Sequence, residues 1–301
     1  MRALIFPGQG SQYVGMAGVV GHAEGVLDMY ERARSVLNYD LLSLIEEGDE
    51  ATLTRTDHTQ PALFVTEMAW VRLLSSHGVL PDVLAGHSLG EFSAFCAAGA
   101  FSFEDGVRLV RTRGEIMARA AAEHPGAMAA VIGLKACDLG PALGAGTLAG
   151  VVEVANYNTE DQIVVSGDVA AVDAVIAHIK GSGSGRAMKL KVGAPFHSSI
   201  MTDGAEEFKV LLRDIAITPA RSPVIGNVAA EVVTDPDAIR AELYLQFKSP
   251  VQWVSTLKKL DSLGVDEYVE VGPRAVLAGM AAKVLPGRDI WSVEGRQWQV
   301  P

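Results

Sequence analysis

Short runs of apolar residues alternate along the chain with longer segments in which apolar residues recur at helical spacing. The first run, residues 3–6, predicts a buried strand that ends at Pro7-Gly8. Further on, the pattern predicts a helix over 60–77, a strand over 83–85, and helices over 89–98 and 103–122. Buried strands that alternate with helices predict a parallel sheet covered by helices on both faces, and therefore an α/β fold.

The middle of the chain has a different order of elements. Strands are predicted over 127–132, 151–155, 162–166 and 187–192, with helices over 136–143 and 169–179. This βαββαβ order is the ferredoxin-like pattern. We therefore expect a small domain over 125–193, inserted into a large α/β domain made of 1–124 and 194–293.

The rest of the chain returns to alternating helices and strands. Helices are expected over 199–215 and from Asp235 and Pro250, and strands over 224–227 and 267–271. The tail, 294–301, is polar and is expected to fray.

Composition excludes several classes of protein. The chain has 301 residues, of which 49% are hydrophobic, so it can bury a core. Its 25 Lys and Arg against 36 Asp and Glu give a net charge of −11, which argues against a nucleic-acid-binding face. Two cysteines make no disulfide framework and favour a reducing, cytoplasmic location. No run is apolar for long enough to predict a membrane span, and the start of the chain does not resemble a signal peptide.

The sharpest local motif is Gly86-His87-Ser88-Leu89-Gly90. It matches G-x-S-x-G, a tight strand-to-helix turn that exposes a serine hydroxyl at the top of a sheet. The Leu89 N–H could then face a developing oxyanion at the start of the helix. The alternative is a glycine-rich turn with an ordinary serine, although the strand and helix on either side favour the nucleophile.

A serine nucleophile needs a base, and His197 is the candidate among seven histidines. It follows a predicted strand and precedes a helix, where the chain re-enters the large domain. A structural or solvated histidine is the alternative. Spacing does not choose an acid such as Asp214 or Glu270 as a third member, and a backbone carbonyl can orient an imidazole equally well.

Several motifs in order along the chain resemble the malonyl-CoA:acyl-carrier-protein transacylases, and among them the free-standing acyltransferases that serve polyketide synthases in trans. The resemblance covers residues 1 to about 285. The motifs are, in order, Phe6-Pro7-Gly8-Gln9-Gly10-Ser11-Gln12, Thr59-Gln60-Pro61-Ala62, Gly86-His87-Ser88-Leu89-Gly90-Glu91-Phe92-Ser93, Arg111-Thr112-Arg113-Gly114-Glu115-Ile116-Met117, Ala155-Asn156-Tyr157-Asn158, Gln162-Ile163-Val164-Val165-Ser166-Gly167, Phe196-His197-Ser198, Gln246, Ser249-Pro250-Val251-Gln252-Trp253 and Glu270-Val271-Gly272-Pro273.

The resemblance implies an α/β-hydrolase-like core with a ferredoxin-like insertion, and a ping-pong reaction. Ser88 would take the malonyl group from malonyl-CoA and pass it to the phosphopantetheine thiol of an acyl carrier protein. His197 would act as general acid and base, oriented by a main-chain carbonyl near Gln246. Gln9 and the Leu89 N–H match the oxyanion hole. No tightly bound cofactor and no metal are implied.

The resemblance also assigns the substrate-binding candidates. Arg113 would pair with the malonyl carboxylate through its planar fork, although a solvated helix-face cation is the alternative. Phe196 resembles the malonyl-selecting form and leaves little room for an α-methyl branch. Asn156 and Asn158 fall where the small domain lines the cleft in relatives, or are ordinary turn residues. His87 lies beside the nucleophile, where a side chain normally points across the turn.

Two residues depart from the family pattern. Pro195 stands where family members often have a small residue before the phenylalanine of the Phe-His-Ser motif. Arg274 stands where glycine often follows the Glu-Val-Gly-Pro motif. The first leaves open transfer of another or larger acyl group, including transfer between carriers. A thioester hydrolase and a scaffold with a vestigial site also stay open as interpretations. An acidic carrier needs a basic patch, for which Arg186, Lys189 and Lys191 are candidates.

Overall fold

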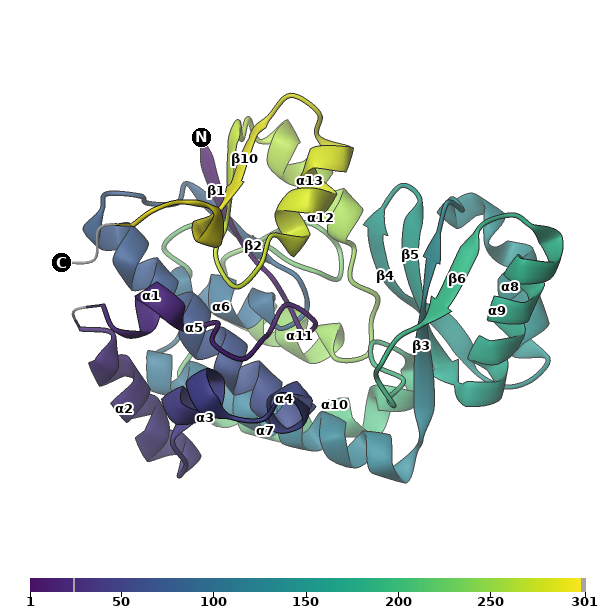
Figure 1. Ribbon diagram of the computed structural model, residues 1–301, viewed down its shortest axis with the longest axis horizontal. Helices are drawn as coiled ribbons and strands as arrows, with labels where there is room; N and C mark the ends of the chain where they lie inside the picture. The colour runs from purple at the N-terminus through teal and green to yellow at the C-terminus, as the bar shows by residue number, and fades with distance from the viewer. Residues whose placement is uncertain (24, 299–301) are drawn as a thin grey trace.

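Two separate β-sheets organise the chain (Figure 1). The structure is a computed structural model that describes residues 1–23 and 25–298, apart from the side chain at position 19. One sheet has six mostly parallel strands and the other has four antiparallel strands. The mixed α/β class predicted from the sequence is confirmed.

The six-stranded sheet runs in the order β10-β9-β1-β2-β7-β8. Its strands are β1 (Arg2–Phe6), β2 (Val83–Gly86), β7 (Val224–Ile225), β8 (Val232–Val233), β9 (Glu267–Glu270) and β10 (Asp289–Ser292). All neighbours are parallel except β7 and β8. Phe6 pairs with Gly86 at the carboxyl ends of β1 and β2. The loops that carry Gln9 and Ser88 therefore leave the sheet at the same edge, where open α/β sheets place their ligands.

Helices cover both faces of this sheet because successive strand residues point to opposite sides. Leu4 and Phe6 pack into the core on one face, and Ala3 and Ile5 into the core on the other. The first face carries α1 (Gly18–Gly21), α2 (Leu27–Leu37), α3 (Leu41–Glu47), α4 (Glu50–Thr54), α5 (Thr56–Ser76), α6 (Gly90–Ala97), α7 (Phe103–Glu123), α10 (Thr202–Asp214) and α11 (Pro236–Gln246). The second face carries α12 (Trp253–Ser262) and α13 (Val276–Val284). Within the described residues, no helix combines the length and hydropathy that a bilayer span requires.

The four-stranded sheet has the order β4-β5-β3-β6 and is antiparallel throughout. Its elements are β3 (Gly126–Ile132), α8 (Gly140–Thr147), β4 (Val152–Thr159), β5 (Gln162–Asp168), α9 (Val169–Ser182) and β6 (Arg186–Lys189). Figure 1 shows α8 and α9 together on its outer face. The predicted βαββαβ order is confirmed, whereas the domain boundaries at 125 and 193 stay a prediction.

The inner face of the antiparallel sheet is turned toward the large sheet. Ala129 and Val131 pack under α8 and α9, whereas Met128 and Val164 join the main core. A short backbone pairing fastens the two parts, with Val251 N donating to Ala155 O at 2.8 Å and Tyr157 N donating to Val251 O at 2.9 Å. The space between the two sheets is therefore bounded by elements from both.

Some predicted boundaries were wrong. Helix α5 starts at Thr56, four residues before the predicted start, and contains Pro61 in its second turn, where the proline lacks one helical N–H. Strand β6 ends at Lys189, so the residues up to 192 are not strand. Helix α12 begins at Trp253 and follows Pro250 by a short turn. The pattern did not predict the four short helices within 18–54, nor α13 and β10.

The expectation that the tail frays is wrong for residues 294–298. The Trp298 ring lies 5.9 Å from the Trp70 ring and 6.2 Å from the Trp291 ring, and its Nε1 donates to Val293 O at 2.7 Å. Glu294 accepts hydrogen bonds from the Tyr13 hydroxyl and the Arg274 N–H. Aromatic packing therefore holds a segment whose composition is polar; residues 299–301 lie outside the described residues.

We predict that Trp298→Ala lowers the free energy of unfolding by about 2 kcal/mol, because a half-buried indole loses its packing and its hydrogen bond. Urea denaturation followed by circular dichroism measures the change. Gln297→Ala, an exposed neighbour, is the control and should stay within about 0.5 kcal/mol of wild type. Equal stability of Trp298→Ala and wild type would show that the tail is not anchored.

Candidate active site

The turn between β2 and α6 holds Ser88 at the carboxyl edge of the parallel sheet. A Cβ at Gly86 would lie 2.0 Å from the Gly90 carbonyl, so the two ends of the turn approach too closely for any side chain. Ser88 has φ of 53°, in the left-handed region that costs a non-glycine residue about 1–3 kcal/mol. Its N–H donates to Asn227 Oδ1 at 2.8 Å. The surrounding structure therefore holds the serine in a strained conformation.

The structure brings Ser88 and His197 together across the space between the sheets. Ser88 Oγ lies 2.7 Å from His197 Nε2, although the residues are 109 apart in the chain. His197 Nδ1 lies 2.9 Å from Gln246 O and 3.2 Å from Ser249 O. Two carbonyl acceptors require the proton on Nδ1, which leaves the Nε2 lone pair for the serine hydroxyl. This geometry suits activation of Ser88 by a neutral imidazole.

The surroundings of His197 keep it neutral. Burial lowers the pKa of His197 to about 3, and the nearby Arg113 cation acts in the same direction. The hydrogen bonds to Gln246 O and Ser249 O oppose this shift and do not overcome it. The imidazole is therefore available to accept a proton throughout the neutral pH range.

Neither acid considered from the sequence touches the histidine. Asp214 is exposed at the end of α10. Glu270 accepts hydrogen bonds from the first N–H groups of α13, those of Val276, Leu277 and Ala278. The orientation of His197 by a backbone carbonyl, left open from the sequence, is what the structure contains.

The two oxyanion-hole candidates lie beside the serine. The Leu89 N–H is at the start of α6, and the described chain offers it no hydrogen-bond partner. Gln9 lines the same cavity as Ser88, and its side-chain Oε1 accepts from the Thr56 hydroxyl at 2.9 Å. A free N–H at a helix start next to a nucleophile is suited to stabilise a negative oxygen.

Arg113 lies buried next to the serine, with an exposed fraction of 1%. Its guanidinium donates to Gln60 Oε1 at 2.7 Å, to Gln246 Oε1 at 2.9 Å and to Ser88 Oγ at 3.1 Å. Burial lowers the pKa of Arg113 to about 10, so it remains a cation at neutral pH. Within the described chain, its Nε has no hydrogen-bond partner.

The other three arginines of α7 behave differently. Arg108, Arg111 and Arg119 each pair with a carboxylate near the surface. No carboxylate of the described residues forms an ion pair with Arg113. A desolvated cation that no carboxylate contacts directly is costly, and a carboxylate entering the cavity would relieve that cost.

The remaining substrate-binding candidates line two adjoining cavities between the sheets. The first has a volume of about 120 Å³ and is lined by Ser88, His197, Arg113, Phe196, Asn156, His87, Gln9, Met117, Met128, Leu190 and Val192. The second, of about 230 Å³, contains Asn158 and shares Gln9, His87, Asn156 and Leu190 with the first. His87 Nε2 lies 2.9 Å from Asn158 Oδ1, so His87 does face this space.

Four residues that contact this site were not predicted from the sequence. Gln60 and Glu91 occur in the family motifs without an expected role, and Ser249 supplies the second carbonyl for His197. Asn227 follows β7, the parallel neighbour of β2, which was a usable signal because both strands end at the same edge.

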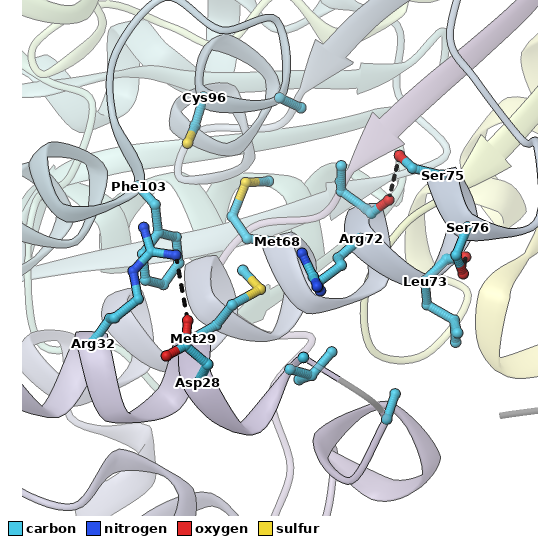
Figure 2. Close-up of a pocket in the computed structure, with 15 residues that line it drawn as sticks. Asp28, Met29, Arg32, Met68, Arg72, Leu73, Ser75, Ser76, Cys96 and Phe103 are labelled. Carbon is cyan, nitrogen blue, oxygen red and sulfur yellow. Dashed lines mark hydrogen bonds and ion pairs between the residues drawn. The ribbon is translucent and has the colours of Figure 1, made fainter. Parts of the chain in front are cut away.

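A larger hollow of about 1060 Å³ lies elsewhere, between α2, α5 and α6. Figure 2 shows Met29, Met68 and Cys96 around it, with Arg32 directed toward Asp28. None of the candidate site residues lines this hollow. Burial raises the pKa of Cys96 to about 12, so this thiol stays protonated and unreactive.

Of the three residues expected to form a basic patch, Arg186, Lys189 and Lys191, one is paired with a carboxylate. Lys189 Nζ forms an ion pair with Asp173 at 2.8 Å, whereas Arg186 and Lys191 are exposed. Across the described residues, no group of three or more His, Cys, Asp or Glu side chains could hold a metal ion.

Comparison with known proteins identifies the family. The model of the acyl transferase domain family matches residues 3–290. The chain belongs to the acyl transferase domain family. Among curated acyl transferases, the malonyl CoA-acyl carrier protein transacylase of Bacillus subtilis is 42% identical over 284 residues, which cover 94% of this chain and 90% of that protein. The enzyme of the same name from Escherichia coli O157:H7 is 39% identical, with coverage of 94% and 92%.

Solved structures of acyl transferases match the whole fold. The acyl carrier protein S-malonyltransferase of Vibrio cholerae superposes with a TM-score of 0.93 at 35% identity, covering 97% of this chain and 96% of that one. A malonyl-transacylase in complex with a type II polyketide synthase acyl-carrier protein also has a TM-score of 0.93 at 35% identity, with coverage of 97% and 95%.

The lowered pKa of His197 predicts the pH dependence of Ser88 reactivity in the free acyl transferase. A depressed pKa extends the neutral, base-competent form to lower pH, so modification by phenylmethylsulfonyl fluoride should show no inflection near the ordinary histidine value of about 6.5. The rate of sulfonylation, corrected for reagent hydrolysis, is measured by intact mass between about pH 5 and pH 8. His197→Ala controls for background. A rate that halves near pH 6.5 would contradict a buried neutral base.

Proposed function

We propose that this acyl transferase moves a malonyl group from malonyl-CoA to the phosphopantetheine thiol of an acyl carrier protein. The observation that carries the proposal is the buried Arg113 guanidinium, 3.1 Å from Ser88 Oγ and without a carboxylate partner in the described chain. An acyl group attached to Ser88 would carry its far end toward that cation. A diacid-derived acyl group supplies the missing carboxylate, and malonyl is the shortest common one.

The size of the cavity supports a short acyl group. A volume of about 120 Å³ is about four water molecules at roughly 30 Å³ each. Phe196 closes one wall and has an exposed fraction of 8%. Discrimination against one added methyl group in such a wall is worth about 1–3 kcal/mol, so methylmalonyl would be disfavoured, not excluded.

In the first half-reaction, Ser88 Oγ attacks the thioester carbonyl while His197 Nε2 takes the hydroxyl proton. The carbonyl oxygen becomes an oxyanion, stabilised by the Leu89 N–H and a donor from Gln9. The carbon–sulfur bond then breaks, and the imidazolium returns the proton to the coenzyme A thiolate. The products are a malonyl ester of Ser88 and free coenzyme A.

In the second half-reaction, His197 Nε2 takes the proton of the carrier's phosphopantetheine thiol. The thiolate attacks the ester carbonyl, the same donors hold the oxyanion, and the bond to Ser88 Oγ breaks. Ser88 recovers its proton from the imidazolium. Gln246 takes part through its backbone carbonyl, which holds the Nδ1 proton through both halves.

The second cavity is suited to the pantetheine arm that both substrates share. It adjoins the first at Gln9 and Asn156, and the amides of Asn158 and Gln162 lie among apolar residues such as Met280. A pantetheine arm combines amide groups with methylene and methyl groups, so this mixed lining matches its chemistry.

The partner is an acyl carrier protein, in fatty-acid or polyketide synthesis. Two relatives named above are malonyl CoA-acyl carrier protein transacylases, and one structural relative was solved with a polyketide carrier. Lys191 follows Leu190 of the second cavity, so a basic side chain lies near its wall for an acidic carrier. A cytoplasmic location stays a prediction.

We predict that malonyl-CoA adds about 86 Da to the protein, as expected for a malonyl ester, and that Ser88→Ala abolishes the adduct. Intact mass spectrometry after brief incubation with malonyl-, methylmalonyl-, succinyl- and acetyl-CoA measures the acyl preference. Circular dichroism controls for folding of the variant. An adduct retained in Ser88→Ala would contradict the nucleophile, and thioester turnover without carrier protein, faster than with it, would indicate a hydrolase.

Removing the cation should change acyl selectivity. Arg113→Ala is expected to slow adduct formation from malonyl-CoA about 100-fold, the worth of a charge-assisted pair, with a much smaller effect on acetyl-CoA. Initial rates with both substrates measure the ratio. Arg119→Ala, an exposed arginine of the same helix that pairs with Glu207, is the matched control. Equal losses with both substrates would remove the carboxylate-binding role.

A further inference from the structure

Glu91 is a buried carboxyl group that the proposed reaction does not use. It lies one turn after Ser88 in α6, and its exposed fraction is 0%. Three N–H groups converge on its two oxygens. Asn227 N and Asn227 Nδ2 donate to Oε1 at 2.7 and 3.1 Å, and Gln246 Nε2 donates to Oε2 at 2.6 Å.

One limb of this network reaches the nucleophile. Asn227 Oδ1 accepts the Ser88 N–H at 2.8 Å, and Asn227 Nδ2 donates to Gly86 O at 2.6 Å. The Asn227 side chain therefore spans both sides of the strained turn. Glu91 fixes its amide, because the nitrogen must face the two acceptors, Gly86 O and Glu91 Oε1, which leaves the oxygen for Ser88.

The other limb reaches the arginine. Gln246 Nε2 donates to Glu91 Oε2 and to Ser88 O at 2.7 Å, which turns its Oε1 toward Arg113 at 2.9 Å. A reversed amide would set its nitrogen against the guanidinium and its oxygen against two acceptors. The acceptors at Glu91 and Ser88 thus decide that Arg113 meets an oxygen.

We propose that Glu91 is a positioning residue that holds the Ser88 turn, through Asn227, and the acyl-selecting Arg113, through Gln246, in one fixed arrangement. The proposal rests on the proposed function, because it concerns how that site discriminates acyl groups. It requires Glu91 to accept on both oxygens, since the bonds that join it to Asn227 and Gln246 all come from N–H donors. Ser88 and Arg113 are thus connected, through Asn227 and Gln246, to the two oxygens of one carboxyl group.

A neighbouring carboxyl group completes the surroundings of Glu91. Glu242 Oε1 accepts the Val228 N–H at 2.7 Å. Burial and then the nearby Glu242 raise the pKa of Glu91, whereas its bonds to Asn227 and Gln246 lower it. Arg113 supplies a positive charge close by, since the Glu91 carboxylate raises the pKa of Arg113 against the effect of burial. Two carboxyl groups and one guanidinium thus share a buried region under the site.

Glu91→Gln tests the proposal because it replaces one acceptor oxygen with a donor amide of the same size. Whichever way the new amide faces, its nitrogen meets an N–H of Asn227 or of Gln246. We expect the maximal rate of acyl-Ser88 formation to fall about tenfold for malonyl-CoA and for acetyl-CoA. For each substrate, this rate divided by the half-saturation concentration measures its specificity. The specificity for malonyl-CoA relative to acetyl-CoA should fall by about another tenfold.

Glu67→Gln is the matched control. Glu67 is also fully buried, and it accepts a hydrogen bond from the hydroxyl of Ser93 on the same helix α6, away from the cavities. This variant should lower the midpoint of thermal unfolding yet keep the wild-type acyl ratio. A role of Glu91 in stability alone would make the two variants alike.

The outcomes separate this proposal from the proposed function. Wild-type protein that forms no malonyl adduct contradicts the function itself. If the wild-type protein forms the adduct but Glu91→Gln and Glu67→Gln have the same malonyl-to-acetyl ratio, the positioning role is overturned. If circular dichroism shows that Glu91→Gln does not fold, the two hydrogen-bond paths, through Asn227 and through Gln246, are tested separately. Asn227→Ala should then slow both substrates equally, and Gln246→Met should lower the malonyl-to-acetyl ratio; unchanged rates and ratio in these variants would also overturn it.

Discussion

The hydrogen bond between Ser88 Oγ and His197 Nε2, 2.7 Å long, is the contact on which the rest of the site depends. Both residues have positive φ, 53° for Ser88 and 57° for His197, so each holds a backbone conformation that its own sequence disfavours. The fold offsets that strain from outside, through Asn227 on the serine side and the carbonyls of Gln246 and Ser249 on the histidine side. A strained pair held in this way is preorganised, because neither partner has to move before proton transfer.

The electrostatics of the site follow from burial. His197 is neutral because it is desolvated beside a cation, and Arg113 remains charged although its described hydrogen-bond partners are all neutral groups. The site thus carries a positive charge that no described residue lining the cavity neutralises. Binding of an acyl carboxylate would remove this imbalance and at the same time weaken the contact between Arg113 and Ser88 Oγ. Under the proposed function, selectivity for acidic acyl groups and release of the nucleophile would therefore be coupled.

The site lies between two sheets that are distant in the chain and make different contributions. The parallel sheet brings Gln9 and Ser88 to one edge because β1 and β2 are in register at Phe6 and Gly86. The antiparallel sheet turns Met128 and Asn156 toward that edge and closes the cavities. The pairing of Val251 with β4 fixes the distance between the two sheets. The two cavities beside Ser88 therefore exist only when both parts are folded and joined.

Local pattern accounts for much of the fold and for some of the site. Short-range signals predicted the alternation of strands with helices, the turn around Ser88 and the βαββαβ order. They sufficed because strand, turn and helix preferences act over a few residues. The docked tail did not follow from pattern, since Trp298 is held by rings at positions 70 and 291 that no local rule connects to it. The short helices after residue 17 were also missed, although Asp40 and Asp49 accept hydrogen bonds from Ser43 N and Thr52 N as N-caps.

By itself, the sequence determined most of the strands and longer helices, the turn that exposes Ser88 and the family pattern that singled out His197 and Arg113. Only the tertiary structure decided that His197 is oriented by carbonyl groups, that Arg113 forms no ion pair with a carboxylate of the described residues, and that Glu91, Asn227 and Gln246 join beneath the site. These facts depend on distances between residues up to 158 positions apart. Such distances are set by the packing of many elements at once, and the burial that shifts each pKa exists only after that packing is complete.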